Sequence, residues 1–215
     1  MKHCKALENQ TTRRILLIAC AAALAVAFTV ALPLPAHAGH VTPPPVPSNI
    51  EVPAGNKVFL EGHAVGTQDY ICLPSGSGFA WTFFGPQATL FNDDEEQVIT
   101  HFLSPNPSES GTPRATWQHS RDTSTVWALA TPATTSFDPD FVAPGAIPWL
   151  LLQVVGAQDG PTGGDKLSET TFIQRLNTSG GIAPSTGCTQ STDVGRRALV
   201  PYTADYFFYR DRESG

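Results

Sequence analysis

The spacing of apolar residues constrains the fold of this chain more than any other feature. From Lys57 onward, short runs rich in Val, Ile, Thr, Phe, Tyr and Trp alternate with clusters of Gly, Pro, Ser and Asp. Alternation with a period of two residues indicates half-buried strands, and the clusters between the runs indicate turns. The strand candidates are 57–64, 67–73, 79–84, 97–103, 114–119, 124–130, 148–155, 169–176 and 198–209.

No helical periodicity is visible after residue 38. About nine strands predict an all-β fold, with a single domain over 55–212 that forms either a β-sandwich or a closed β-barrel. The polar segments 104–113 and 156–168 predict long surface loops. The five prolines of residues 39–54 exclude a helix or a central strand, so we expect an extended Pro-rich leader there that acts as a spacer.

The first 38 residues have the three parts of a secretory signal peptide. Four basic residues lie within the first fourteen, an apolar run follows over 15–32, and Ala36-His37-Ala38 offers small residues to the signal peptidase. We therefore expect cleavage after Ala38 and export to the periplasm or the extracellular space.

Three other interpretations of this segment remain open. The apolar run is about long enough for residues 15–34 to serve as an uncleaved membrane anchor, which would be the protein's contact with a membrane. Leu17 to Cys20 is similar to the cleavage motif of lipoproteins, and Thr12 to Leu17 is similar to a twin-arginine export motif.

The charge of the chain excludes one class of partner. The net charge is -6, and removal of residues 1–38 takes away four basic residues and one acid, which makes it -9. An acidic protein is a poor partner for nucleic acid, because the phosphate backbone repels it. A small molecule, a glycan or another protein remains as the partner.

Two cysteines, Cys72 and Cys188, remain after removal of the first 38 residues. In an exported chain, two cysteines favour one disulfide bond, which would enclose 115 residues of this sequence. A free, reactive pair is the alternative.

Several strings of residues resemble the DUF3455 family of secreted proteins without an established function. The resemblance extends from about Val52 to Arg210, and its most specific strings are Ile173-Gln174-Arg175-Leu176-Asn177-Thr178 and Val200-Pro201-Tyr202-Thr203-Ala204-Asp205-Tyr206. One departure is visible: where family members have a short Gly-Pro-Thr-Trp turn, this chain has the longer segment 104–116 before Trp117.

Four side chains are the candidates for a functional site. His101 lies between Ile99 and Leu103 on one strand face, which predicts burial and makes it a candidate metal ligand or catalytic base. Trp117 and His119 share a strand face, so both are candidates beside a ligand, and His119 is a second candidate metal ligand. Arg175 shares a face with Ile173, so it needs a partner such as Asp205.

Two classes of function stay open at this point. The first is a non-enzymatic secreted binding or cell-surface module. The second is an extracellular metal-assisted enzyme, a hydrolase or an oxidoreductase, that uses His101. The cofactor is unknown, but no nucleotide cofactor is expected, because the chain has neither a Gly-x-Gly-x-x-Gly sequence after a strand nor a phosphate-binding loop.

Overall fold

The computed structural model describes residues 41–213, and strands account for most of them. The strands are β1 (Asn56–Ser75), β2 (Gly78–Phe91), β3 (Gln97–Asn106), β4 (Thr112–His119), β5 (Thr125–Leu129), β6 (Thr135–Ser136), β7 (Trp149–Gln158), β8 (Thr170–Gly180) and β9 (Arg197–Asp211). The helices of the described part are four short 3₁₀ turns: η1 (Ser48–Ile50), η2 (Pro107–Glu109), η3 (Pro132–Thr134) and η4 (Ser191–Asp193). The prediction of an all-β fold is confirmed.

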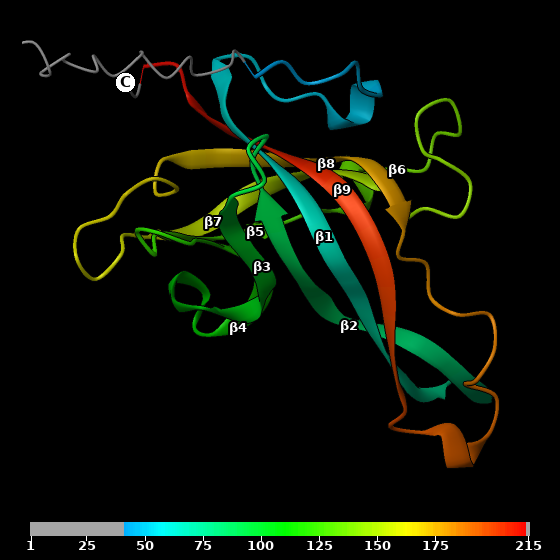
Figure 1. Ribbon diagram of the computed structural model, residues 1–215. Coiled ribbons are helices and arrows are strands. Elements are labelled where there is room, and N and C mark those ends of the chain that lie inside the picture. Colours follow the sequence, from blue (N-terminus) through cyan, green and yellow to red (C-terminus); the bar gives the residue numbers. More distant parts are fainter. Residues whose placement is uncertain (1–40, 214–215) are drawn as a thin grey trace, which may run out of the picture. The chain divides into compact units, whose positions relative to one another are not determined.

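Eight of these strands close into an antiparallel barrel (Figure 1). Neighbouring strands pair in the order β5-β4-β3-β2-β1-β9-β8-β7, and β5 also pairs with β7, which closes the ring between Thr125↔Gln158 and Leu129↔Gln153. The short β6 pairs only with β7 and lies beyond β5 on the same edge. The fold is therefore a closed barrel with one extra strand, and the sandwich alternative is excluded.

The strand boundaries differ from the prediction in two ways. The two strands expected over 57–64 and 67–73 form one continuous strand, β1. Gly66 makes this possible, because a Cβ atom at that position would lie 2.1 Å from the Gln87 carbonyl oxygen on β2. The loops expected over 104–113 and 156–168 are shorter, since β3 continues to Asn106 and β7 to Gln158. Backbone pairing extends these strands through residues whose polar side chains predicted loops.

One end of the barrel interior is filled with apolar side chains. Leu90, Ile99, Val126, Ile173 and Phe208 come from five different strands and are all fully buried. Leu167, in the connection between β7 and β8, belongs to the same cluster, and its backbone N–H donates to the Ser124 hydroxyl at 3.0 Å. We call this end of the barrel the closed end, and the opposite end the open end.

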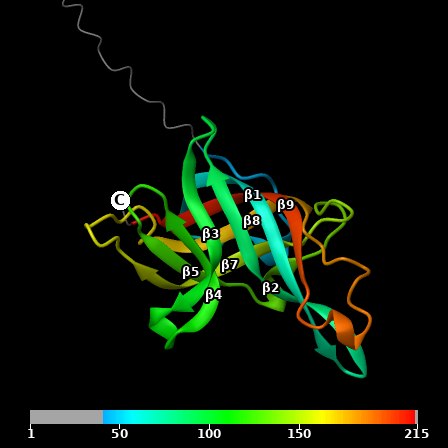
Figure 2. The same cartoon turned by 60° about the horizontal axis from the view of Figure 1, so that its bottom comes forward.

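A two-stranded arm extends from the open end, where β1 ends and β2 begins. The arm and the segment before β9 lie side by side in both views (Figures 1 and 2). A disulfide joins Cys72 to Cys188 with their Cα atoms 5.5 Å apart, which confirms the predicted pair. The Trp81 indole N–H also donates to the Thr186 carbonyl at 2.9 Å. The disulfide and this hydrogen bond attach the loop after β8 to the arm.

Residues 41–54 of the Pro-rich leader pack on the outer wall of the barrel and do not stand away from it as a free spacer. Ile50 is fully buried in a second apolar cluster that includes Trp149, Leu176 and Phe207. The Gln174 amide donates to the Ile50 carbonyl at 2.7 Å. The outward faces of β7, β8 and β9 are apolar here and need a cover, which the leader provides. The predicted signal peptide lies outside the described residues.

Among residues 41–213, no helix has the length and the apolar character needed to cross a membrane.

Candidate functional site

The open end of the barrel contains a cavity of about 210 Å³. Every barrel strand contributes to its wall, from Gln68 on β1 to Tyr206 on β9. A cavity that all eight strands line is the lumen of the barrel itself. Its wall is mainly apolar, with leucine, alanine, proline and aromatic side chains, and none of the lining residues is an Asp or a Glu.

Arg175 extends from β8 into this cavity and is only 8% exposed. Its Nη2 and Nε donate to the Pro148 carbonyl at 2.9 and 3.3 Å. The described residues include no carboxylate within ion-pair distance of its guanidinium. Arginine stays charged in proteins, so this is a buried positive charge without a negative partner.

The prediction that Asp205 pairs with Arg175 was wrong. Register explains why, because Arg175 lies opposite Tyr206 across the β8–β9 ladder, whereas Asp205 lies opposite Leu176. Neighbouring residues of a strand point to opposite faces, so Asp205 faces outward while Arg175 faces inward. On the outer wall, Asp205 instead accepts a hydrogen bond from Asn177 at 2.8 Å and bonds His63 at 2.7 Å.

His101 lines the same cavity and is 3% exposed, as its place between two apolar residues predicted. Its imidazole stacks on the Trp117 indole with ring centroids 4.1 Å apart, and its Nδ1 donates to the Thr116 carbonyl at 2.8 Å. Burial lowers the pKa of His101 to about 3, and the charge of Arg175 acts in the same direction. The ring is therefore neutral near pH 7, with Nε2 as a hydrogen-bond acceptor.

Two further lining residues have buried donors without partners. The side-chain Nε2 of Gln68 and the indole Nε1 of Trp117 make no hydrogen bond of normal geometry among the described residues, although the Tyr202 hydroxyl interacts with the Gln68 side chain. The Tyr206 hydroxyl lies 3.3 Å from that of Tyr202, and burial raises the pKa of Tyr206, so the phenol stays protonated. Buried polar groups are nearly always hydrogen-bonded, so two orphaned donors in one cavity need an explanation.

A second arginine, Arg114, lines the rim of the cavity but has a partner. Its Nη2 and Nε donate to the two carboxylate oxygens of Glu109 at 2.7 and 2.8 Å. These hydrogen bonds lower the pKa of Glu109 to about 2.

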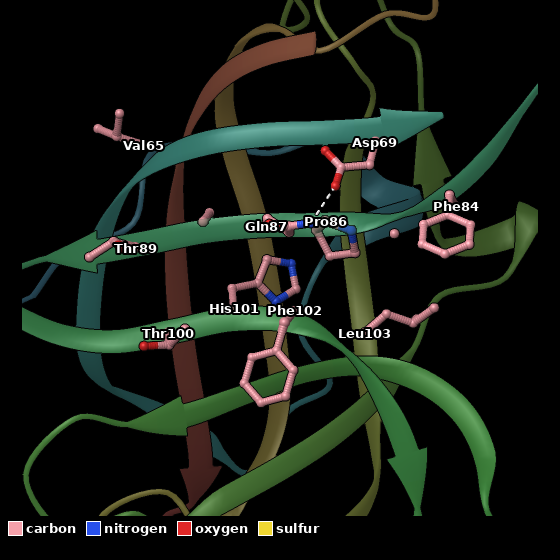
Figure 3. Close-up of a pocket in the computed structure, with 12 residues that line it drawn as sticks. Val65, Asp69, Phe84, Pro86, Gln87, Thr89, Thr100, His101, Phe102 and Leu103 are labelled. Carbon is pink, nitrogen blue, oxygen red and sulfur yellow. Dashed lines mark hydrogen bonds between the residues drawn. The ribbon is translucent and has the colours of Figure 1, made fainter. Parts of the chain in front are cut away.

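The barrel wall has a hollow of about 490 Å³ beside His101 (Figure 3). It forms where β2 and β3 separate, because their pairing extends from Phe91↔Gln97 only to Ala88↔His101. Pro86, His101 and Leu103 line both this hollow and the lumen. The imidazole of His101 therefore lies between the outer surface and the cavity.

Figure 3 also shows Asp69 directed toward Gln87 across the hollow, and the Gln87 amide donates to its carboxylate at 2.6 Å. Asp69 accepts a second hydrogen bond from the Thr67 hydroxyl. The only acid of the hollow is thus held by its own neighbours.

The structure separates the two histidines that were candidate metal ligands. His119 faces inward beside Trp117, as predicted, but it lies toward the closed end, where its Nδ1 is 3.0 Å from Asp122. The only described group of three residues with metal-ligating atoms within 4.8 Å consists of Glu61, His63 and Asp205 on the outer wall. It contains neither His101 nor His119, so a metal role for those two stays a prediction.

Sequence reasoning missed Gln68 and Arg114. A signal for Gln68 was available, since Ala64, Gly66 and Gln68 follow one another at a spacing of two, and Ala64 faces the core. An amide on an inward strand face is unusual and could have marked the cavity. Arg114 begins the predicted strand 114–119 but nothing in the local pattern marked it, and its partner Glu109 lies in segment 104–113, which was interpreted as a loop.

Comparison with known proteins gives one match. Residues 53–210 match the family described as "Protein of unknown function (DUF3455)". No curated protein and no solved structure matches the chain.

Proposed function

The chain belongs to the DUF3455 family, and from the geometry of its lumen we propose that it is a non-enzymatic binding protein for one small, mainly apolar organic molecule. The observation that carries this proposal is the cavity at the open end, which all eight barrel strands line.

The contrast with an ordinary small barrel supports this proposal. The interior of an eight-stranded barrel is just wide enough to be filled by side chains or to hold one small ligand. The closed end of this barrel follows the first pattern and the open end the second. Ligand sites are typically apolar cavities with a few convergent polar groups, here Gln68, His101 and Arg175.

The chemistry of His101 favours binding over catalysis. A general base needs a pKa near the working pH, but burial lowers that of His101 to about 3. Its Nδ1 is engaged by a backbone carbonyl, whereas a catalytic histidine is usually oriented by a carboxylate. We therefore assign His101 the role of a neutral acceptor in the cavity wall.

We further propose that the protein acts after export, with residues 1–38 removed and the domain of residues 55–212 carrying the binding site. The Cys72–Cys188 bond is consistent with an oxidising compartment, because disulfides persist there and are rare in the cytosol. Mass spectrometry of the protein from expressing cells tests this, and a chain that begins at Gly39 is expected. A chain that retains its first 38 residues would contradict it.

Binding in the lumen is tested with a probe and a variant that fills the cavity. Benzyl alcohol is titrated into ¹⁵N-labelled protein, and backbone amide shifts are followed by NMR. We expect shifts at residues that line the lumen and saturation at millimolar concentration or below. In an Ala128→Phe variant, the new ring occupies the cavity and should abolish the shifts, since Ala128 lines it and is 2% exposed.

Ala80→Phe is the matched control, because Ala80 lies in the arm outside the barrel and should leave binding unchanged. Absence of binding to the wild type, or shifts confined to the outer wall, would overturn the proposal.

A further inference from the structure

The open end of the lumen holds one positive charge that the protein does not balance. Arg175 is only 8% exposed, and its guanidinium contacts two neutral acceptors, the Pro148 carbonyl and the Tyr206 hydroxyl, but no carboxylate. An unpaired buried charge is costly, so a position of this kind normally has a carboxylate partner or a ligand. Arg114, at the rim of the same cavity, has its carboxylate in Glu109. The difference between the two arginines is that Arg175 alone is left for a ligand.

The neutral groups of the cavity favour a ligand that carries hydrogen-bond acceptors. The amide Nε2 of Gln68 and the indole Nε1 of Trp117 are buried donors that make no hydrogen bond of normal geometry. Gln68, at 3% exposure, and Arg175 come from β1 and β8, the two strands that flank β9. Two orphaned donors and a guanidinium together require a molecule rich in acceptor atoms. The neutral His101, with its Nε2 as an acceptor, lines the same cavity.

Charge selects an anion even though the protein as a whole is acidic. The net charge of the chain is -6, but no acidic residue lines the cavity. A cation in a low-dielectric cavity focuses the local field and attracts anions despite the negative outer surface. Since Arg175 is the one cation of the cavity without an acidic partner, a single negative charge on the ligand balances it.

Size and wall chemistry limit the rest of the ligand. A cavity of about 210 Å³ corresponds to roughly seven waters at their liquid volume. The wall opposite Arg175 is formed by apolar residues such as Ala128, Leu150 and Leu152. A short apolar body fits this space, and a long acyl chain does not fit within it.

We infer that the ligand is a small organic acid with a compact apolar body, and that Arg175 binds its carboxylate with help from the Gln68 amide. This inference rests on the proposed binding of a small molecule in the lumen. Planar guanidinium and carboxylate groups form paired, charge-assisted hydrogen bonds, which are stronger than neutral ones.

Three probes with the same ring and different head groups test the inference: benzoate, benzyl alcohol and benzylammonium. Isothermal titration calorimetry on the purified protein should give a dissociation constant for benzoate at least tenfold lower than for benzyl alcohol. Benzylammonium should not bind, because Arg175 repels it. In an Arg175→Met variant, benzoate should lose this tenfold advantage, while benzyl alcohol binds as in the wild type.

Arg121→Met is the matched control, since Arg121 lies on the surface outside the cavity, paired with Glu96, and its loss should leave the preference for benzoate intact. If Arg175→Met fails to fold, Gln68→Leu replaces it and should reduce the affinity for benzoate severalfold without affecting benzyl alcohol.

The outcomes separate this inference from the proposed function. Equal binding of benzoate and benzyl alcohol to the wild type would overturn the inference that the ligand is an acid, and would leave the proposed binding in the lumen in place. A benzoate preference that survives both Arg175→Met and Gln68→Leu would overturn the assigned residues. If no probe binds, both the inference and the proposed function are wrong.

Discussion

At the closed end of the barrel, fully buried apolar side chains from five strands pack together with Leu167 from the connection between β7 and β8. At the open end, the same strands surround a cavity with an unpaired arginine and two buried donors that make no hydrogen bond of normal geometry. The buried acid of the closed end, by contrast, is well hydrogen-bonded: the Asp122 carboxylate accepts from Ser124 and from the backbone N–H of Lys166. The open end thus gathers a buried charge and two unsatisfied donors around one cavity, whereas at the closed end the Ser168 hydroxyl beside Leu167 lacks a partner without such a charge near it.

This difference separates stability from function within one barrel. Apolar packing stabilises the closed end, whereas the open end relies on local attachments such as the Cys72–Cys188 bond and the Arg114–Glu109 pair. Proteins tend to break the rules of packing and polar satisfaction at functional sites and compensate elsewhere. Substitutions at the two ends should therefore have different effects, and the following predictions test that.

The largest effect is expected for Phe208→Ala at the closed end. Phe208 is fully buried, so the variant loses the burial of a phenyl ring and leaves a cavity, at a cost of about 3–5 kcal/mol in the free energy of unfolding. Leu150→Ala at the open end should cost no more than about 2 kcal/mol, because Leu150 borders existing space. Urea unfolding followed by far-UV circular dichroism measures both, and equal losses would remove the distinction between the ends.

The next effect concerns the disulfide of the arm. Cys188→Ser should lower the free energy of unfolding by about 2–5 kcal/mol, because the bond closes a long loop and restricts the unfolded chain. The closed end should keep its packing, so far-UV and near-UV circular dichroism of the folded variant should match the wild type. A loss of near-UV signal would show that the arm also supports the core.

A smaller and pH-dependent effect is expected for His101. In the unfolded chain, His101 has its ordinary pKa of 6.5 and binds a proton below that pH. In the folded protein, burial lowers the pKa and keeps the imidazole neutral down to about pH 3. The stability contributed by neutral His101 is thus fully present above pH 6.5. It falls with decreasing pH by on the order of 1.4 kcal/mol per unit.

A His101→Gln variant lacks this group and should show a correspondingly flatter pH dependence of stability between pH 6.5 and 4. Urea unfolding at a series of pH values measures the two slopes. Parallel curves for the variant and the wild type would mean that His101 becomes protonated in the folded protein.

The smallest effect is expected for Arg175→Met in the absence of ligand. Replacement of Arg175 by an apolar side chain of similar length removes the desolvation cost of the charge but also its hydrogen bonds to Pro148, so the free energy of unfolding should change by less than about 1 kcal/mol. Thermal unfolding of the ligand-free protein measures this. A loss above about 3 kcal/mol would instead identify Arg175 as a structural clamp and weaken the contrast between the two ends.

Much of the fold could be predicted from the sequence, because strand formation leaves a local pattern. The period of two placed His101 and Arg175 inward correctly, and the predicted export signal together with the cysteine count predicted the Cys72–Cys188 bond. The packing of Ile50 in the leader was not predictable in this way. Its prolines restrict the backbone of the leader, but they give no information about the apolar outer wall that the leader covers.

The sequence by itself determined that the chain forms strands and which side chains of most strands share a face, because both follow from neighbours a few residues apart. Only the tertiary structure decided that β5 pairs with β7, that Asp205 lies opposite Leu176, and that space remains beside Arg175. Closure and register depend on hydrogen bonds between residues far apart in the sequence. A cavity depends on the combined volume of side chains from all eight strands, which no local pattern records.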